Sequence, residues 1–255
     1  MAQLDIDRLE RQVQAVYRDV AEQPDEEFHF ETGRELAERL GYEPDDLEFV
    51  PPAAIDSFAG VGYHFDLAAL EPRNRVLDLG SGSGMDCFVA GLHVTETGVV
   101  TGVDYTTEQR EKARCLAREH GFHNVRFTHG HIEDLPFNDG TFDVVISNGV
   151  INLSPEKDRV FAEAHRVLKS DGRLALSDII SEKEMPESIK SNADLWAACI
   201  GGAMQIGRYE EAVEAAGFDV LEIRENTEYR FTSESAVNAC DKYGVKSISL
   251  GATVV

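Results

Sequence analysis

The feature that most constrains the fold is an alternation of apolar segments and longer helical patterns that begins near residue 75. Short runs rich in Val, Ile and Leu are followed by stretches of about ten or more residues with helical spacing. This alternation is typical of parallel βαβ units with right-handed crossovers. The apolar runs are nearly continuous, as expected for strands that helices cover on both faces. The chain is therefore predicted to form an α/β domain.

The expected elements follow from this pattern and from Gly, Pro and Asn at its breaks. We expect strands at 75–80, 99–104, 124–130, 142–148, 172–180, 219–225 and 247–255. We expect helices at 86–94, 107–121, 154–169, 187–203, 208–218 and 233–244.

The first 70 residues follow a different pattern. Residues 1–22 have the spacing of a helix, and Thr32 is a candidate cap for a short helix that ends at Gly41. Residues 44–65 are rich in Pro, Gly and aromatic side chains, which predicts irregular structure or short helices. We therefore divide the chain into an N-terminal helical cap, 1–70, and a main domain, 71–255.

The charge balance restricts the partners. The sequence has 47 acidic and 24 basic residues, a net charge of −23, which disfavours nucleic acid and anionic membranes as partners. Arginine outnumbers lysine 17 to 7 and the acids are spread along the whole chain, which together suggest adaptation to high salt. The N-terminus lacks the pattern of a signal peptide and no run of about 18 apolar residues occurs, so we expect a cytoplasmic protein.

A glycine-rich turn follows the first expected strand. Residues 80–84 read GSGSG and open a helix, an arrangement that lets the backbone turn tightly and approach a ligand. Asp104 ends the next strand, where an acid binds ribose hydroxyls in Rossmann-like sites. Asp78 lies two residues before the glycines, and we expect it to face the loop or a cationic part of the ligand.

Two classes of cofactor suit such a turn. A nicotinamide dinucleotide needs the helix N-terminus for its pyrophosphate, but here that helix begins with Asp86, an unfavourable neighbour for phosphate. A cofactor without phosphate and with a positive centre fits better, and S-adenosylmethionine is such a molecule.

Four motifs together resemble the class I S-adenosylmethionine-dependent methyltransferases. They are VLDLGSGSG, VTGVDYTTEQREKAR, GHIEDLPFNDGTFDVVISNGVINL and RVLKSDGRLALSD, between residues 75 and 178. The resemblance implies a Rossmann-like fold with a seven-stranded, mainly parallel sheet that has one antiparallel strand. It places Gly80 and Gly82 at the methionyl part of the cofactor and Asn148 near the sulfonium.

The remaining cofactor residues come from the same resemblance. Asp104 would bind the ribose, and Ile132 and Glu133 would contact the adenine, whereas many relatives have Asp at the position of His131. The full set of cofactor residues predicted here is Asp78, Gly80, Ser81, Gly82, Asp104, Tyr105, Ile132, Glu133 and Asn148.

Within that superfamily, the stretches GSGSGMDCFVA, SNGVINLSPEKDRVF and LWAACIGGA resemble the arsenite methyltransferases. In that family the first and third carry cysteines that bind trivalent arsenic, which implies that Cys87 and Cys199 are catalytic metalloid ligands. A soft metalloid prefers thiolates. Because Cys87 falls in the first turn of a helix, we expect its thiolate to be favoured.

The departures from that family concern the other thiols. Many relatives have Cys where this chain has Gly149, and their N-terminal Gly-Cys region appears here as SFAGVGYHF. The four cysteines form no CxxC pair, which indicates free thiols. Cys240 matches the family poorly, so a third ligand would come from it or from an exogenous thiol; Cys115 is expected to be structural. No resident metal is predicted.

Two further functions stay open. The chain could methylate a small organic acceptor, such as a quinone precursor, or it could be a non-catalytic module that binds the cofactor. An intact glycine loop, the ribose acid and the two thiols favour an enzyme.

Overall fold

The computed structural model describes residues 5–190, 195–196 and 200–255. The strands are β1 (Arg75–Leu79), β2 (Val99–Asp104), β3 (Val125–His129), β4 (Phe142–Asn148), β5 (Leu168–Ser181), β6 (Met204–Gln205), β7 (Phe218–Glu225) and β8 (Lys246–Val254). The helices are α1 (Ile6–Glu22), α2 (Arg34–Leu40), α3 (Pro44–Leu47), α4 (Pro52–Asp56), α5 (Phe65–Ala68), α6 (Met85–Val94), α7 (Thr107–Glu119), the 3₁₀ turn η1 (Ile151–Leu153), α8 (Lys157–Val167), α9 (Glu187–Lys190), α11 (Ile206–Ala215) and α12 (Glu234–Tyr243).

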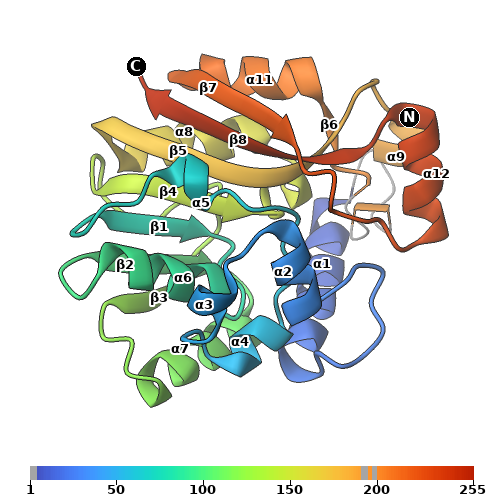
Figure 1. Ribbon diagram of the computed structural model, residues 1–255. Coiled ribbons are helices and arrows are strands. Elements are labelled where there is room, and N and C mark those ends of the chain that lie inside the picture. The colour runs from blue at the N-terminus through green and yellow to red at the C-terminus, as the bar shows by residue number, and fades with distance from the viewer. Residues whose placement is uncertain (1–4, 191–194, 197–199) are drawn as a thin grey trace.

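The strands form one sheet in the order β3-β2-β1-β4-β5-β8-β7, with the short β6 beside β5 (Figure 1). β8 runs antiparallel to both β5 and β7, while the pairs β1–β2, β1–β4, β2–β3 and β4–β5 are parallel. The prediction of seven strands, mainly parallel with one antiparallel, is confirmed, and β6 is a short addition to it.

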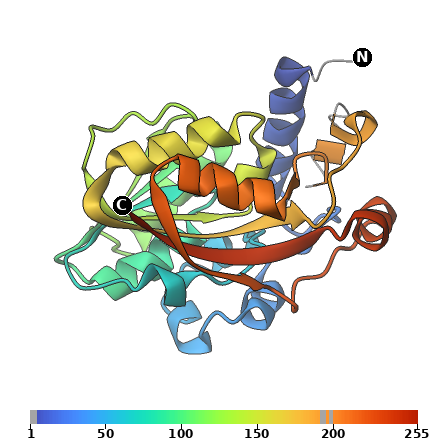
Figure 2. The same ribbon diagram turned by 90° about the horizontal axis from the view of Figure 1, so that it is seen from above.

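Both faces of the sheet are covered, which explains why its strands are apolar throughout. Side chains alternate along a strand, so neighbours point to opposite faces. Val76 and Ile146 pack into a cluster with α6, α7 and the short N-terminal helices. Leu77 and Val145 pack into a second cluster with α8 and α11, which lie together on the other face (Figure 2). Apart from the exposed Arg75 and the half-buried Asp143 and Asn148, the residues of β1 and β4 are buried.

The N-terminal helix α1 lies at the edge of the sheet where the parallel strands end. Leu9 and Val13 of α1 belong to one apolar cluster with Leu153 of η1, Trp196 and Ile200. The ribbon diagrams show α1 beside this edge rather than on either face (Figures 1 and 2). This arrangement does not test the predicted boundary between a cap at 1–70 and a main domain at 71–255, which stays a prediction.

The carboxyl end of α1 is tied to the rest of the molecule by polar contacts. Ser57 is buried and its hydroxyl donates to the carbonyl of Val20 at 2.8 Å. Lys112 of α7 donates to the carbonyl of Ala21 and to the hydroxyl of Ser57, both at 2.8 Å. These bonds satisfy carbonyls that the end of a helix leaves without a partner in the helix.

Two local predictions differ from the structure. Gly33, at φ 89°, occupies the cap position of α2 in place of Thr32, and no side chain caps that helix. The helix expected at 187–203 is wrong in its extent: residues 187–190 and 195–196 are helical, but residues 201–202 form a turn before β6. A methyl group on Gly202 would lie 1.9 Å from the carbonyl oxygen of Asn152, so this turn depends on close backbone packing. Residues 191–194 and 197–199 lie outside the described part of the chain.

No helix among the described residues is both long enough and apolar enough to span a membrane.

The polar tie at the end of α1 leads to a first prediction. Ser57→Ala leaves the carbonyl of Val20 and the ammonium of Lys112 short of a buried partner, so we expect a loss of about 1–2 kcal/mol in the free energy of unfolding. Urea unfolding followed by circular dichroism measures it. The control is Thr97→Ala, which removes an exposed hydroxyl that bonds only to Thr95. Equal stability of the two variants would contradict the prediction.

Candidate cofactor and acceptor site

The site lies at the carboxyl ends of β1 and β4, the point at which the order of the strands in the sheet reverses. From β1 the chain proceeds outward through β2 and β3, and β4 then returns to the other side of β1. Crevices at such points, outside the carboxyl ends of the strands, are the usual ligand sites of open α/β sheets. A cavity of about 1180 Å³, open to solvent, occupies this position.

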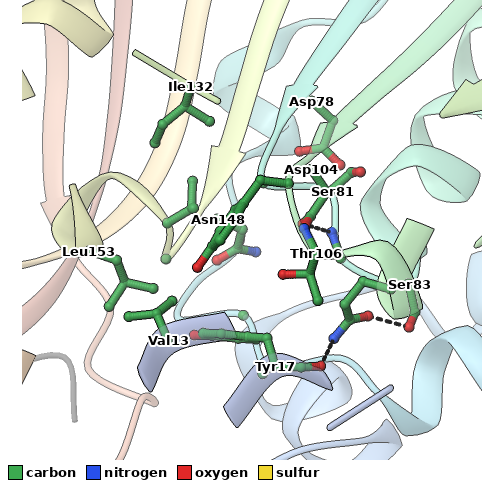
Figure 3. A pocket seen from close by; sticks show the side chains of 18 of the residues that line it. Val13, Tyr17, Asp78, Ser81, Ser83, Asp104, Thr106, Ile132, Asn148 and Leu153 are labelled. Atoms are coloured by element: carbon green, nitrogen blue, oxygen red, sulfur yellow. Dashed lines mark hydrogen bonds between the residues drawn. The ribbon is translucent and has the colours of Figure 1, made fainter. Parts of the chain in front are cut away.

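All nine residues predicted for the cofactor line this single cavity. The glycine turn follows β1, Asp104 ends β2, and Asn148 ends β4, so three neighbouring strands deliver them to one edge. Figure 3 shows the side chains of Asp78, Asp104, Ile132 and Asn148 around the open space. Their contact with a cofactor is a proposal, whereas their position around the cavity is a feature of the fold.

The glycine turn is held close to its surroundings. Gly80 has φ 68°, and a methyl group there would lie 2.5 Å from the side chain of Val150. The amide of Gly82 donates to one oxygen of Asp104 at 2.9 Å, and the amide of Thr106 donates to the other at 2.7 Å. These two bonds fix Asp104 at the carboxyl end of β2, with its carboxylate at the cavity wall.

The cavity is acidic. Burial raises the pKa of Asp104, and it raises the pKa of Asp86 to about 6. The pKa of Asp78 lies well above its usual value, first through burial and then through the charge of Asp86. Among the described residues that line the cavity there is no lysine or arginine. Such a lining suits a ligand with a positive centre and repels phosphate.

At the far end of the cavity, two rings form part of the wall. Tyr105 and His131 stack with their centroids 5.6 Å apart. Ile132 lies beside them, and the carboxylate of Glu133 accepts a hydrogen bond from the hydroxyl of Ser154. An apolar and aromatic surface next to an acid is able to receive an adenine ring and its amino group.

A buried and unpartnered hydroxyl also points to a ligand. Ser81 is 8% exposed, lines the cavity, and its hydroxyl has no hydrogen-bond partner. Buried polar atoms normally have partners. The turn glycines, the fixed acid of β2, this hydroxyl and the absence of positive charge in the described lining all fit S-adenosylmethionine.

Comparison with known proteins agrees with this site. A family model described as a methyltransferase domain matches residues 70–217. An arsenic(III) S-adenosylmethionine methyltransferase from Chlamydomonas reinhardtii has a solved structure that is 32% identical, with a TM-score of 0.65, over 88% of this chain and 74% of that one. The chain belongs to the class I S-adenosylmethionine-dependent methyltransferases. Its cofactor is S-adenosylmethionine.

Curated relatives have a more specific name. An arsenite methyltransferase of Halobacterium salinarum is 41% identical over 202 residues, which are 78% of this chain and 51% of that protein. The arsenite methyltransferase of Mus musculus is 48% identical over 139 residues, 51% of this chain and 37% of that protein. This methyltransferase therefore spans about half the length of the curated relatives it matches, or less.

The methyltransferase has a cavity wall that the sequence motifs did not reveal. Leu9, Val13 and Tyr17 of α1 line it, spaced four residues apart on one side of the helix. The side chain of Gln109 joins α1 to the glycine turn: it donates to the carbonyl of Tyr17 at 2.7 Å and accepts from Ser83 at 2.5 Å (Figure 3). The apolar spacing along α1 was the available signal, but it did not say what the helix covers.

The placement of Cys87 overturns one expectation. Cys87 has no exposed surface, does not line the cavity, and donates from Sγ to Asp78 at 3.2 Å. Burial, followed by the charge of Asp78, raises the pKa of the thiol well above its usual value. The prediction that the helix N-terminus favours a thiolate is therefore wrong, because burial and nearby carboxyls outweigh the helix dipole.

The other thiols divide into two groups. Cys199 lies outside the described residues, so its predicted role stays a prediction. Cys240 of α12 and Cys115 of α7 are half-buried and neither lines the cavity. Gly149, where many relatives have Cys, has φ 76°, and a methyl group there would lie 3.2 Å from Val61. The described wall of the cavity therefore contains no thiol.

The burial of Cys87 leads to a second prediction. In the folded protein, iodoacetamide at about pH 8 modifies Cys115 while Cys87 stays unmodified, since the thiolate is the reactive form. Peptide mass spectrometry at a series of times measures both sites. Cys87 becomes reactive only after unfolding in urea. Modification of Cys87 at the rate of Cys115 in the native protein would contradict this placement.

Proposed function

We propose that this protein transfers a methyl group from S-adenosylmethionine to trivalent arsenic, as arsenite or a related thiol-bound metalloid. The observation that carries the proposal is the 41% identity to the Halobacterium arsenite methyltransferase over 78% of the chain. The cofactor supplies an electrophilic methyl group, and the lone pair of trivalent arsenic is a sufficient nucleophile without a general base. The protein then has to hold the two in line.

The acceptor would be held by fewer thiols of the chain than in many relatives. Cys87 is buried behind the cavity wall, which leaves Cys199 as the cysteine that its motif assigns to arsenic. Trivalent arsenic favours sulfur ligands, so exogenous thiols would complete its coordination. An uncharged thiol suits the acidic lining better than an anionic one, because like charges repel most strongly where water is excluded.

A small organic acceptor is the second candidate. One observation favours it: part of the described cavity lining is apolar, with Val13, Val150 and Leu153, and that lining holds no cysteine. Such a surface suits a flat apolar metabolite as well as it suits a metalloid. The two candidates differ in their need for Cys199.

The third prediction separates these candidates. With S-adenosylmethionine and 2-mercaptoethanol, the wild type methylates arsenite, and Cys199→Ser lowers the rate about a hundredfold because the acceptor loses its position. Liquid chromatography coupled to arsenic detection measures the methylated products. Cys115→Ser, which changes a thiol on α7 away from the cavity, is the matched control and keeps the wild-type rate. A wild type that binds the cofactor but does not methylate arsenite would overturn the arsenite proposal.

We also propose that the protein is adapted to high salt. The net charge of −23 supports this, as does a curated relative from a Halobacterium. Close-range repulsion between surface carboxylates is a cost to the folded state that concentrated salt screens. A cytoplasmic location stays a prediction.

The fourth prediction tests the adaptation to salt. The Tm rises continuously between about 0.1 M and 1 M KCl, as the Debye length falls from about 10 Å to 3 Å. Differential scanning fluorimetry measures it, and sorbitol at equal osmolality is the control for effects unrelated to charge. A Tm that falls with KCl would refute the proposal.

A further inference from the structure

The side chain of Asp86 is a buried carboxyl group, and no positively charged side chain among the described residues pairs with it. It is 6% exposed and lines the cavity at the first turn of α6. No lysine, arginine or histidine lies within ion-pair distance of it among the described residues. The residues outside the described part of the chain include none of these three types. A buried carboxylate without a positive partner costs free energy, which a bound cation would recover.

Neutral donors hold this carboxyl in one orientation. One oxygen accepts from the hydroxyl of Tyr42 at 2.5 Å, and the other accepts from the side-chain amide of Asn148 at 3.1 Å. Asn148 is itself fixed, because its oxygen accepts from the backbone amide of Val61 at 2.8 Å. Tyr42 precedes α3 and Asn148 ends β4, so two segments that are distant in the sequence hold the carboxyl group of Asp86 on α6.

The hydrogen bond from Asn148 places Asp86 beside the carboxyl end of β4. Asn148 is the residue that the methyltransferase motifs put beside the sulfonium, and Asp86 bonds to its side chain. Asp104 and Glu133, which the motifs assign to ribose and adenine, have other hydrogen-bond partners: Thr106 just after β2 and Ser154 after β4. Asp86 is therefore available to the charged centre of the cofactor rather than to its nucleoside.

We propose that Asp86 is the residue that distinguishes S-adenosylmethionine from S-adenosylhomocysteine, through the attraction between its carboxylate and the sulfonium. The two ligands share adenosine, ammonium and carboxylate groups and differ in the methyl group and the charge on sulfur. After transfer the sulfur is neutral, and the attraction to Asp86 is lost. S-adenosylhomocysteine then binds more weakly than S-adenosylmethionine, which favours replacement of the product by a new cofactor molecule. This inference rests on the cofactor and is independent of the acceptor.

The proton balance of the site supports this role. The pKa of Asp86 is raised to about 6 by burial, against the lowering effect of Tyr42 and Asn148. The groups that face or lie near it are Asp78 of β1, Asp104 of β2, Cys87 of its own helix, Tyr42, Tyr63 and Asn148. The pKa of Asp78 is also raised, first by burial and then by the charge of Asp86, so the two carboxyls titrate as a coupled pair.

The fifth prediction compares the two ligands in the full chain by isothermal titration calorimetry. Asp86→Asn keeps a similar shape and an acceptor for Tyr42 but removes the charge. We expect its Kd for S-adenosylmethionine to rise about tenfold or more, with little change for S-adenosylhomocysteine, because only the former carries charge at sulfur. Tyr42→Phe is the matched control, because it removes a hydrogen bond to the same carboxylate but keeps the charge. Since that bond lowers the pKa of Asp86, all variants are titrated at alkaline pH, where Asp86 is ionised without it, and Tyr42→Phe then leaves the ratio of the two Kd values close to that of the wild type.

Each other outcome overturns the assignment. Equal weakening of both ligands by Asp86→Asn means that the carboxylate acts on shared groups or on the fold. Unchanged binding of both means that it faces neither. An equal change of the ratio in Tyr42→Phe means that geometry rather than charge decides.

A measurement on the wild type keeps the proposal testable if Asp86→Asn does not fold. Between about pH 7 and pH 5 the ionised fraction of a group with a pKa of about 6 falls to about one tenth. The affinity for S-adenosylmethionine therefore falls with acidification, and the affinity for S-adenosylhomocysteine falls much less. Parallel pH profiles for the two ligands would reject the role of Asp86, whether or not arsenite is the acceptor.

Discussion

The pairing of β1 with β2 on one side and with β4 on the other is the constraint on which the site depends. It aligns Leu79, Val103 and Ser147 in neighbouring strands, so that the residues after them meet at one edge. The glycine turn, Asp104 and Asn148 are brought together by this register alone. A slip by one residue would reverse the face of each side chain, so that Val76 and Leu77 would exchange the two clusters into which they pack.

This dependence on local pattern explains what could be predicted from the sequence. β2 and β4 begin and end at the expected residues, and the nine cofactor residues share a cavity because each lies near the carboxyl end of a strand or in the segment that follows it. The helix expected at 187–203 does not reach residue 203, because Gly201 and Gly202 form a turn that packs closely against Asn152 and Trp196. That contact joins residues about 50 positions apart in the case of Asn152, and no periodicity encodes it.

Cys87 shows the same limit within the site. The motif fixes its position in the first turn of α6, but the rotation of that helix on the sheet decides which side chains reach the cavity. Met85 and Asp86 line it, while Cys87 points to Asp78 and to Gly102 of β2, where a methyl group would lie 2.8 Å from the sulfur. The small residue at 102 makes room for the thiol in the core. The motif predicts that Cys87 lies in the first turn of α6, but the packing of this helix on the sheet determines where its side chain points.

This protein has two groups of acidic residues, one on the surface and one buried at the cavity, and we assign recognition of the cofactor to the buried group. The acids on the surface are in water, where salt reduces their field to a few ångströms at about 1 M. The carboxyls of Asp78, Asp86 and Asp104 are buried, and salt screens buried groups much less. Under the proposed adaptation to concentrated salt, recognition of a cationic cofactor therefore needs buried groups. The acid at the first turn of α6, held by Tyr42 and Asn148, meets that need in a way that surface charge cannot.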